Sequence, residues 1–373
     1  MSFLTPQKPW IMCSSIEASD RVTFKELSQF ECTKSTYNCS HPRDRKPDPF
    51  KCVKKYRRSA AGGGVQSHSQ ENGNLDERSL EDLEITVDYL LGKIFAHQRS
   101  DGMEEQLSLV KSVNFVDDRL RAVQVDLTTL LGKLSAANAI DMTVWTTVRR
   151  MQVKLIRYNI LAQYMLSSLA SDKYQWKFAQ KALTTAISSF FATFHGRHKQ
   201  QYLSDTDEKD LDEVMCYAAL LHIATVVKKN ELALPQSSST GQQCGMALDW
   251  GQGISAILGI YQKYVSPSTC THNDSPDKKI YPKYQWALRI ANAIDCGDFL
   301  FALRLLKPTR EIQSKSDGAI STNECWSMIS RCCVAQIVPI LRIGLIRRYN
   351  KSFGKQEKVK DTDVSLKMMI QIL

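Results

Sequence analysis

Apolar residues recur at the spacing of an α-helix over most of the chain beyond residue 79. Residues three or four positions apart share one face of a helix, so each run can bury that face and leave the other in water. The pattern therefore predicts a series of amphipathic helices. Their apolar stripes are Leu80, Leu83, Val87, Leu90, Leu91 and Ile94; Val116, Leu120, Val123, Leu127, Leu130 and Leu131; Val144, Val148, Met151, Leu155, Ala162, Met165 and Leu169; Ala179, Leu183, Ala186, Ile187, Phe190, Phe191 and Phe194; and Leu211, Val214, Met215, Ala218 and Leu221.

Polar residues mark where several of these helices begin and end. Ser79 is followed three residues later by Asp82, the pattern of a capping box, and Asp141 can cap the third helix. Gly132 is expected to interrupt the second stripe. Carboxylates crowd the start of the fifth helix, where they interact favourably with the positive end of the helix dipole, and we interpret them as helix-start residues. They are Asp207, Glu208, Asp210, Asp212 and Glu213.

Polar segments at residues 235–245 and 266–282 separate further helices. The pattern predicts one helix over residues 284–296, a turn at Gly297 and Asp298, and another helix over residues 299–306. Strand alternation is absent from the sequence pattern. The predicted fold is all-α, an α-solenoid of stacked helical pairs of the PCI or TPR kind.

The two ends of the chain are patterned differently from the middle. The first sixty residues carry many charges and three closely spaced prolines, and residues 61–74 are rich in Gly, Ser, Asn and Gln. We therefore predict an N-terminal basic segment at 1–60, a flexible linker at 61–78, a helical-repeat domain at 79–307, a second linker at 308–320 and terminal helices at 321–373.

An apolar run at helical spacing, residues 340–346, passes directly into a cationic segment. Such a helix can pack along its apolar part and offer its basic end to a polyanion or an acidic partner. The cationic residues are Arg347, Arg348, Lys351, Lys355, Lys358 and Lys360.

Charge and cysteine content narrow the class of protein. The 373 residues have a formal net charge of +10, which favours nucleic acid, anionic surfaces or acidic proteins as partners. Eleven cysteines in no framework spacing suit reduced thiols in the cytosol or nucleus, and no secretory leader is visible. The longest apolar run, residues 214–227, contains His222 and is too short to cross a bilayer. We expect a soluble intracellular protein without a cofactor.

Most residues that could bind a metal, bind a phosphate or act in catalysis are better interpreted as structural or surface residues. Cys32, Cys39, His41 and Cys52 supply zinc-type atoms but lack knuckle spacing, so a metal site is not expected. The glycines at 62–64 lack the Gly-Lys-Ser/Thr ending of a phosphate loop. Histidines occur without a nucleophile motif, and His222 on an apolar helix is best interpreted as a core residue. The sequence does not indicate an enzyme.

A second basic cluster precedes the linker, with Phe50 and Tyr56 interleaved. Cations with aromatic rings can neutralise phosphates and stack bases, although a solvated charged surface explains the same pattern equally well. Its cations are Arg43, Arg45, Lys46, Lys51, Lys54, Lys55, Arg57 and Arg58.

Several segments together resemble the Sac-three/GANP family of PCI-like scaffold subunits of nuclear mRNA-export complexes. The segment CSSIEASDR with LSQFE is similar to the family's Cys-Pro-x-x-Glu, Arg and Leu-x-x-Phe-Glu signature, with Ser14 in place of the usual proline. VKKYRRSAAG resembles its Lys-x-Tyr-x-Arg-Ser-Ala motif, in the form of some plant members. NFVDDRLRAVQVDLT departs from the family's Arg-Gln at Gln124 and Val125, and ITVDYLL and IRRYNKSFGKQEKV match other landmarks. The matching residues include Cys13, Glu17, Arg21, Phe30, Tyr56, Arg119 and Asp126.

The resemblance implies a nuclear, non-enzymatic scaffold of helical repeats ending in a winged helix. It also implies binding to a second PCI-domain protein, a small acidic subunit, and RNA or single-stranded nucleic acid. We expect the nucleic acid at Lys54, Lys55, Arg57, Arg58, Arg347, Arg348, Lys351, Lys355, Lys358 and Lys360. After the lysine-rich turn, residues 361–373 offer room for one helix, so we expect a truncated winged-helix start. A centrosome- or spindle-associated structural protein of the same family is the alternative, and a proteasome-lid or signalosome PCI subunit would not explain the N-terminal motifs.

Overall fold

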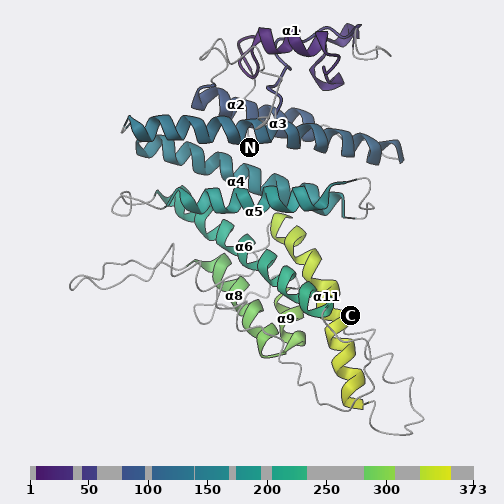
Figure 1. Ribbon diagram of the computed structural model, residues 1–373. Coiled ribbons are helices and arrows are strands. Elements are labelled where there is room, and N and C mark those ends of the chain that lie inside the picture. The colour runs from purple at the N-terminus through teal and green to yellow at the C-terminus, as the bar shows by residue number, and fades with distance from the viewer. Residues whose placement is uncertain are drawn as a thin grey trace, which may run out of the picture. The chain divides into compact units, whose positions relative to one another are not determined.

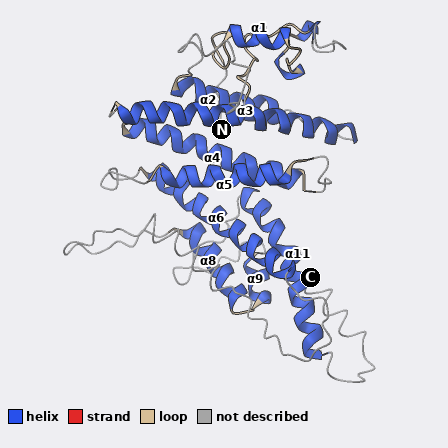
Figure 2. Cartoon of the chain, in the orientation of Figure 1, coloured by secondary structure: helices blue, strands red, loops and turns tan. Residues whose placement is uncertain are grey.

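The computed structural model describes residues 6–36, 44–56, 78–96, 103–137, 139–167, 174–194, 204–232, 281–306 and 328–353. At residues 103–108, 226–232, 340 and 343–353 it describes the backbone alone. These described residues form helices and loops without a named strand, and a single bridge pairs Cys32 with Pro47 (Figure 2). The prediction of an all-α, solenoid-type fold is confirmed, while the expected winged-helix start at 354–373 lies outside the described residues.

The chain forms two compact units, residues 1–186 and 187–373. The division falls inside the range that the sequence predicts as one helical-repeat domain. The predicted linkers at 61–78 and 308–320 fall largely outside the described residues, so those boundaries stay predictions. Among the described helices, none is long and apolar enough to cross a membrane.

The first unit combines an N-terminal segment with long helices (Figure 1). The segment contains α1 (Ser15–Thr23) and the short 3₁₀ turns η1 (Gln29–Glu31) and η2 (Lys34–Thr36). The helices are α2 (Leu80–Tyr89), which continues as the π-helix η5 (Leu90–Phe95), then α3 (Met103–Ala136) and α4 (Met142–Met165). α5 (Trp176–Ala192) begins in the first unit and ends in the second.

Two of the predicted helix starts are confirmed at atomic detail. Ser79 and Asp82 form a capping box, in which the Ser79 hydroxyl accepts the Asp82 N–H and the Asp82 carboxylate accepts the Ser79 N–H. Asp141 caps α4 by accepting the N–H of Val144 at 2.8 Å. Both caps satisfy backbone donors that the first turn of a helix leaves without partners.

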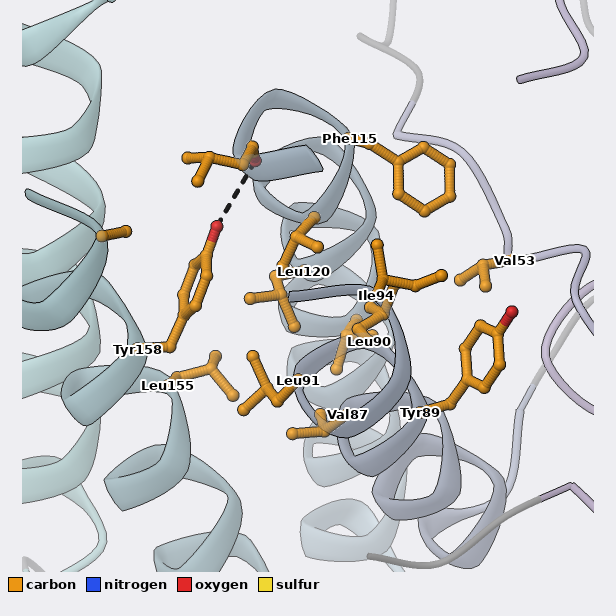
Figure 3. Packing of buried hydrophobic residues seen from close by; sticks show 14 of the residues in the cluster. Val53, Val87, Tyr89, Leu90, Leu91, Ile94, Phe115, Leu120, Leu155 and Tyr158 are labelled. Atoms are coloured by element: carbon orange, nitrogen blue, oxygen red, sulfur yellow. Dashed lines mark hydrogen bonds between the residues drawn. The ribbon is translucent and has the colours of Figure 1, made fainter. Parts of the chain in front are cut away.

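The apolar stripes of α2, α3 and α4 meet in one core, which includes Val87, Leu120 and Leu155 (Figure 3). Met12 and Val53 of the N-terminal segment belong to the same cluster, and Val53 is fully buried. The N-terminal segment therefore shares the core of the helices although it precedes them by a long connection. A smaller cluster of Cys13, Ala18, Leu27, Cys32 and Cys52 lies within the segment itself.

Two details of the sequence interpretation are wrong. Gly132 does not interrupt its helix, because α3 continues to Ala136 and the glycine lies on an open surface with nothing near its missing Cβ. Met165 does not belong to the buried stripe of α4, because it sits at the end of the helix and is 43% exposed. Leu169, from the same stripe, lies outside the described residues.

The second unit is built from α6 (Asp205–Leu232), α8 (Pro282–Asp295), α9 (Phe299–Leu305) and α11 (Met328–Phe353). α6 packs against α8 and α11, and α9 packs against α8 and α11. The predicted turn between α8 and α9 is confirmed: Gly297 has φ 72°, and Asp298 caps α9 by accepting the N–H of Phe301 at 2.9 Å. Glycine suits that φ because it lacks a Cβ.

One residue of the acidic start of α6 has a different role from the predicted one. The Asp212 carboxylate accepts the N–H groups of Lys283 at 3.1 Å and Tyr284 at 2.9 Å, in the first turn of α8. Tyr281, the N-cap residue of α8, provides no side-chain hydrogen bond. Asp212 therefore caps a helix about seventy residues further along the chain, and burial raises its pKa despite these hydrogen bonds.

Candidate functional site

The inward face of α1 is charged rather than apolar. Glu17 and Arg21 are buried there beside Ala18, whereas Ile16 on the other side is 52% exposed. The hydroxyl of Ser14 caps the helix by accepting the Glu17 N–H at 3.1 Å. Ser14 has φ −68°, a value that proline also adopts, so the local backbone suits the family's proline as well as this serine. The helix buries charges because a charged partner lies beneath it.

That partner is Glu31, whose side chain is completely buried between two arginines. Arg21 Nη1 donates to both carboxylate oxygens, at 2.8 and 2.9 Å. Arg119 of α3 donates from Nη2 at 3.0 Å and from Nε at 3.3 Å. Burial by itself would raise the pKa of Glu31, but the guanidinium groups of Arg119 and Arg21 hold it below its ordinary value.

Backbone donors complete the surroundings of Glu31. The Val53 N–H donates to Oε1 at 3.1 Å and the Ser28 N–H to Oε2 at 3.2 Å. The carboxylate thus joins α1, η1, the segment after η2 and α3 at one point. We call Arg21, Glu31 and Arg119 the buried ion cluster. Removing one partner from such a group leaves an uncompensated buried charge, which is strongly destabilising.

The cysteines around the buried ion cluster are structural. Arg21 Nη2 donates to the Cys13 sulfur at 3.3 Å, and burial raises the pKa of the Cys13 thiol to about 12. Burial also raises the pKa of Cys52, so both thiols stay protonated and are poor nucleophiles or metal ligands at neutral pH. Cys32 is buried as well, whereas Cys39 and His41 lie outside the described residues.

A second group of polar contacts holds residues 54–56 against α1 and α3. Lys54 Nζ lies 3.0 Å from Asp126 Oδ1, and the Tyr56 N–H donates to Asp118 at 3.4 Å. The Lys55 N–H donates to Glu17 at 2.9 Å. We call these three contacts the polar seam. It extends the attachment of the N-terminal segment along about two turns of α3.

Arg78, which follows the undescribed residues 57–77 in the sequence, also binds the Asp126 carboxylate. Its Nε lies 2.8 Å from Asp126 Oδ2, and its Nη1 donates to the Met12 carbonyl at 3.5 Å. Asp126 therefore binds both Lys54 and Arg78. Arg78 was missed by sequence reasoning, since a single arginine before a capping serine gives no signal of a distant carboxylate.

An aromatic pair covers the buried ion cluster. Phe30 of η1 lies 5.1 Å from Phe115 of α3, measured between ring centroids. The Arg119 guanidinium lies over the Phe115 ring at 4.5 Å, a distance at which cation–π attraction operates. The side chains of Arg119 and Glu31 are buried, and burial strengthens the attraction between their charges.

The predicted motif residues thus gather in one place. Cys13, Glu17, Arg21, Phe30, Tyr56, Arg119 and Asp126 all take part in the buried ion cluster, its aromatic cover or the polar seam. This arrangement positions no nucleophile beside a base among the described residues. Its contacts attach the N-terminal segment to α3.

The predicted nucleic-acid contacts are only partly within the described residues. Lys54 is paired with Asp126, and Lys55 Nζ lies 3.0 Å from Glu26 Oε2. Arg347, Arg348 and Lys351 occupy the last turns of α11, where the structure describes the backbone. Arg57, Arg58, Lys355, Lys358 and Lys360 lie outside the described residues.

Comparison with known proteins yields one match. A model of the SAC3/GANP family matches residues 12–373. No curated protein and no solved structure was found to match the chain. The matched range begins just before Cys13, so it includes every residue of the buried ion cluster and of the polar seam.

Proposed function

The chain belongs to the SAC3/GANP family, a family of scaffold proteins associated with nuclear mRNA export, and on this basis we propose that it is a non-enzymatic nuclear scaffold subunit. In this proposal it binds a second PCI-domain protein, a small acidic subunit, and RNA or single-stranded nucleic acid. The chain's net charge of +10 favours such acidic partners.

The observation that supports the proposal best is the buried ion cluster. Glu31 binds Arg21 of α1 and Arg119 of α3, and Arg119 lies 88 residues further along the chain than Glu31. A rigid attachment of this kind keeps the N-terminal segment in a fixed place on α3. A scaffold needs such rigidity because mobile binding surfaces lose affinity when they become ordered on binding.

The first experiment tests the partners. The full chain, tagged and expressed in cells, is purified from nuclear extract with and without nuclease, and the bound proteins are identified. We expect a PCI-domain protein that remains bound after nuclease treatment. Recovery of tubulin or centrosomal proteins in its place would favour the alternative role, and loss of every partner with nuclease would contradict direct scaffolding.

The second experiment tests nucleic-acid binding and the residues proposed for it. The affinity of the full chain for a labelled oligouridylate is measured over a series of salt concentrations, and each phosphate contact adds about 0.7 to the slope of log affinity against log salt. We expect R57A/R58A to reduce the slope. K54A/K55A is the matched comparison, and the ion pairs of both lysines with carboxylates predict a smaller change. A wild-type protein that does not bind would contradict this part of the proposal.

A further inference from the structure

An exposed aromatic ring lies at the start of α5, on a helix with exposed lysines and far in sequence from both predicted basic segments. Phe178 is 46% exposed, although phenylalanine is usually buried. The next residue, Ala179, is buried in the core and receives on its carbonyl a hydrogen bond from Gln163 Nε2 at 3.2 Å. The backbone beside Phe178 is thus anchored to α4 while the ring faces outward.

One side of the ring is occupied by an arginine. The Arg121 guanidinium of α3 lies over the Phe178 ring, 5.7 Å from its centroid, within the range of cation–π attraction. This contact orders the exposed ring without covering it. A ring held in place loses less conformational entropy when a planar ligand stacks on it.

Two lysines of α5 lie near Phe178 in the sequence: Lys177 precedes it and Lys181 follows it by three residues, about one helical turn. Both are exposed, and neither forms an ion pair with any residue that the structure describes. α5 contains no acidic residue. On the neighbouring stretch of α3, Asp118 is paired with Arg119, and Asp126 with Lys54 and Arg78. Asp117 accepts the Tyr158 hydroxyl at 2.8 Å and also interacts electrostatically with Arg121. The nearby carboxylates are therefore engaged within the fold, whereas the lysines remain available.

We propose that Phe178, Arg121, Lys177 and Lys181 form a stacking site for single-stranded nucleic acid, which we call the α5 platform. A base stacks on the Phe178 ring, and the lysines contact the phosphates on either side of it. Aromatic rings interleaved with cations bind single strands in this way because every base presents a flat face. The proposal rests on the proposed nucleic-acid binding and locates it at residues that neither basic segment contains.

An acidic polypeptide is the alternative ligand for this site. It differs from nucleic acid in how much its binding depends on the Phe178 ring. Carboxylates would be attracted by Lys177 and Lys181 but gain little from the face of Phe178. Nucleic acid uses both the charges and the ring. Substitutions that remove the ring while keeping the charges therefore separate the two occupants.

The test uses the full chain and a short fluorescein-labelled oligouridylate, with affinity measured by fluorescence anisotropy at several salt concentrations. We expect F178A to weaken binding about 5- to 150-fold, the usual effect of removing one stacking ring. F178W retains a flat aromatic face and is expected to bind like the wild type. F178L keeps apolar bulk without an aromatic face and should behave like F178A.

Two further variants complete the design. F24A removes a phenylalanine that is 65% exposed at the end of α1, and we expect no change in affinity. K177Q/K181Q should lower the salt slope by about 1.4, the sum of two phosphate contacts. Circular dichroism spectra of all variants should match the wild type, because each substituted side chain is exposed.

The outcomes separate the two proposals. Wild-type binding that is unchanged in F178A overturns the α5 platform and leaves nucleic-acid binding elsewhere on the chain intact. A wild-type chain that binds no oligouridylate overturns both. Binding of polyglutamate that depends on Lys177 and Lys181 but is unchanged in F178A assigns these lysines to an acidic protein and overturns the platform.

Discussion

At the scale of single residues, Glu31 has the largest predicted effect on stability. Glu31→Gln keeps the shape and an acceptor for the Val53 N–H but removes the charge that balances Arg21 and Arg119. We expect the free energy of unfolding to fall by about 3–5 kcal/mol, measured by urea denaturation. Glu26→Gln, which breaks the exposed pair with Lys55, should change it by less than about 1 kcal/mol. Equal effects of the two substitutions would contradict the importance of burial.

Replacement of Asp117 should have the opposite effect on stability, and the size of this effect depends on pH. Burial raises its pKa to about 6, even though the Tyr158 hydroxyl donates to it. Its unfolded pKa is about 3.9, so between these values the folded protein binds more protons and its stability falls as pH rises. At pH 7.5 the ionised carboxylate is costly. Asp117→Asn should therefore stabilise the fold by about 1–2 kcal/mol at pH 7.5 and by less at pH 5. Urea melts at the two pH values measure this, and a pH-independent difference would count against it.

At the scale of elements, Gly132 offers a direct test of helix propensity. It lies inside α3 on an open surface, so Gly132→Ala should raise the free energy of unfolding by about 0.5–1 kcal/mol. Gly297→Ala is the control, because the φ of 72° between α8 and α9 is unfavourable for alanine and the substitution should destabilise. Thermal melts of both variants give the comparison. A destabilising Gly132→Ala would indicate that the helix is bent or contacted at this position.

Helix existence and caps could be predicted from the sequence, while long-range polar contacts could not. The stripes and the capping residues Ser79 and Asp141 are local signals, and the structure confirms them. Gly132 misled the prediction because one glycine costs a helix only about 1 kcal/mol, which the rest of a 34-residue helix outweighs. Asp212 misled it because a carboxylate near a helix start has the same local pattern whether it caps its own helix or a distant one.

In the candidate site, too, the residues could be predicted from the sequence but their long-range contacts could not. The family resemblance singled out the motif residues, yet no spacing in the sequence shows that Arg119 reaches Glu31. The lysines at 54 and 55 look like a solvated basic cluster in the sequence, and only the fold reveals their carboxylate partners. Phe178 was assigned to no stripe, and the structure shows that it is exposed beside the buried Ala179.

At the scale of the whole molecule, the chain divides into two compact units, and we expect unfolding to reflect this division. Leu127 is buried in the core of the first unit, so Leu127→Asp places a charge among apolar side chains and should destabilise that unit by about 3 kcal/mol or more. Hydrogen exchange should show lost protection in α2, α3 and α4, with α6 and α8 less affected. Val125→Asp, at a position 51% exposed on the same helix, is the control. Equal loss of protection in both units would show a single cooperative structure.

The buried ion cluster also dictates the order of events while the chain is being synthesised. Glu31 leaves the ribosome with Arg21 nearby, but Arg119 follows 88 residues later. At about 5–20 residues per second, this delay is roughly 4–18 seconds. During that interval the N-terminal segment has its first arginine but neither its second nor the α3 surface on which it docks. The N-terminal segment is therefore made before the helices of its unit but is among the last parts of that unit to become fixed, and until then it needs protection from premature association.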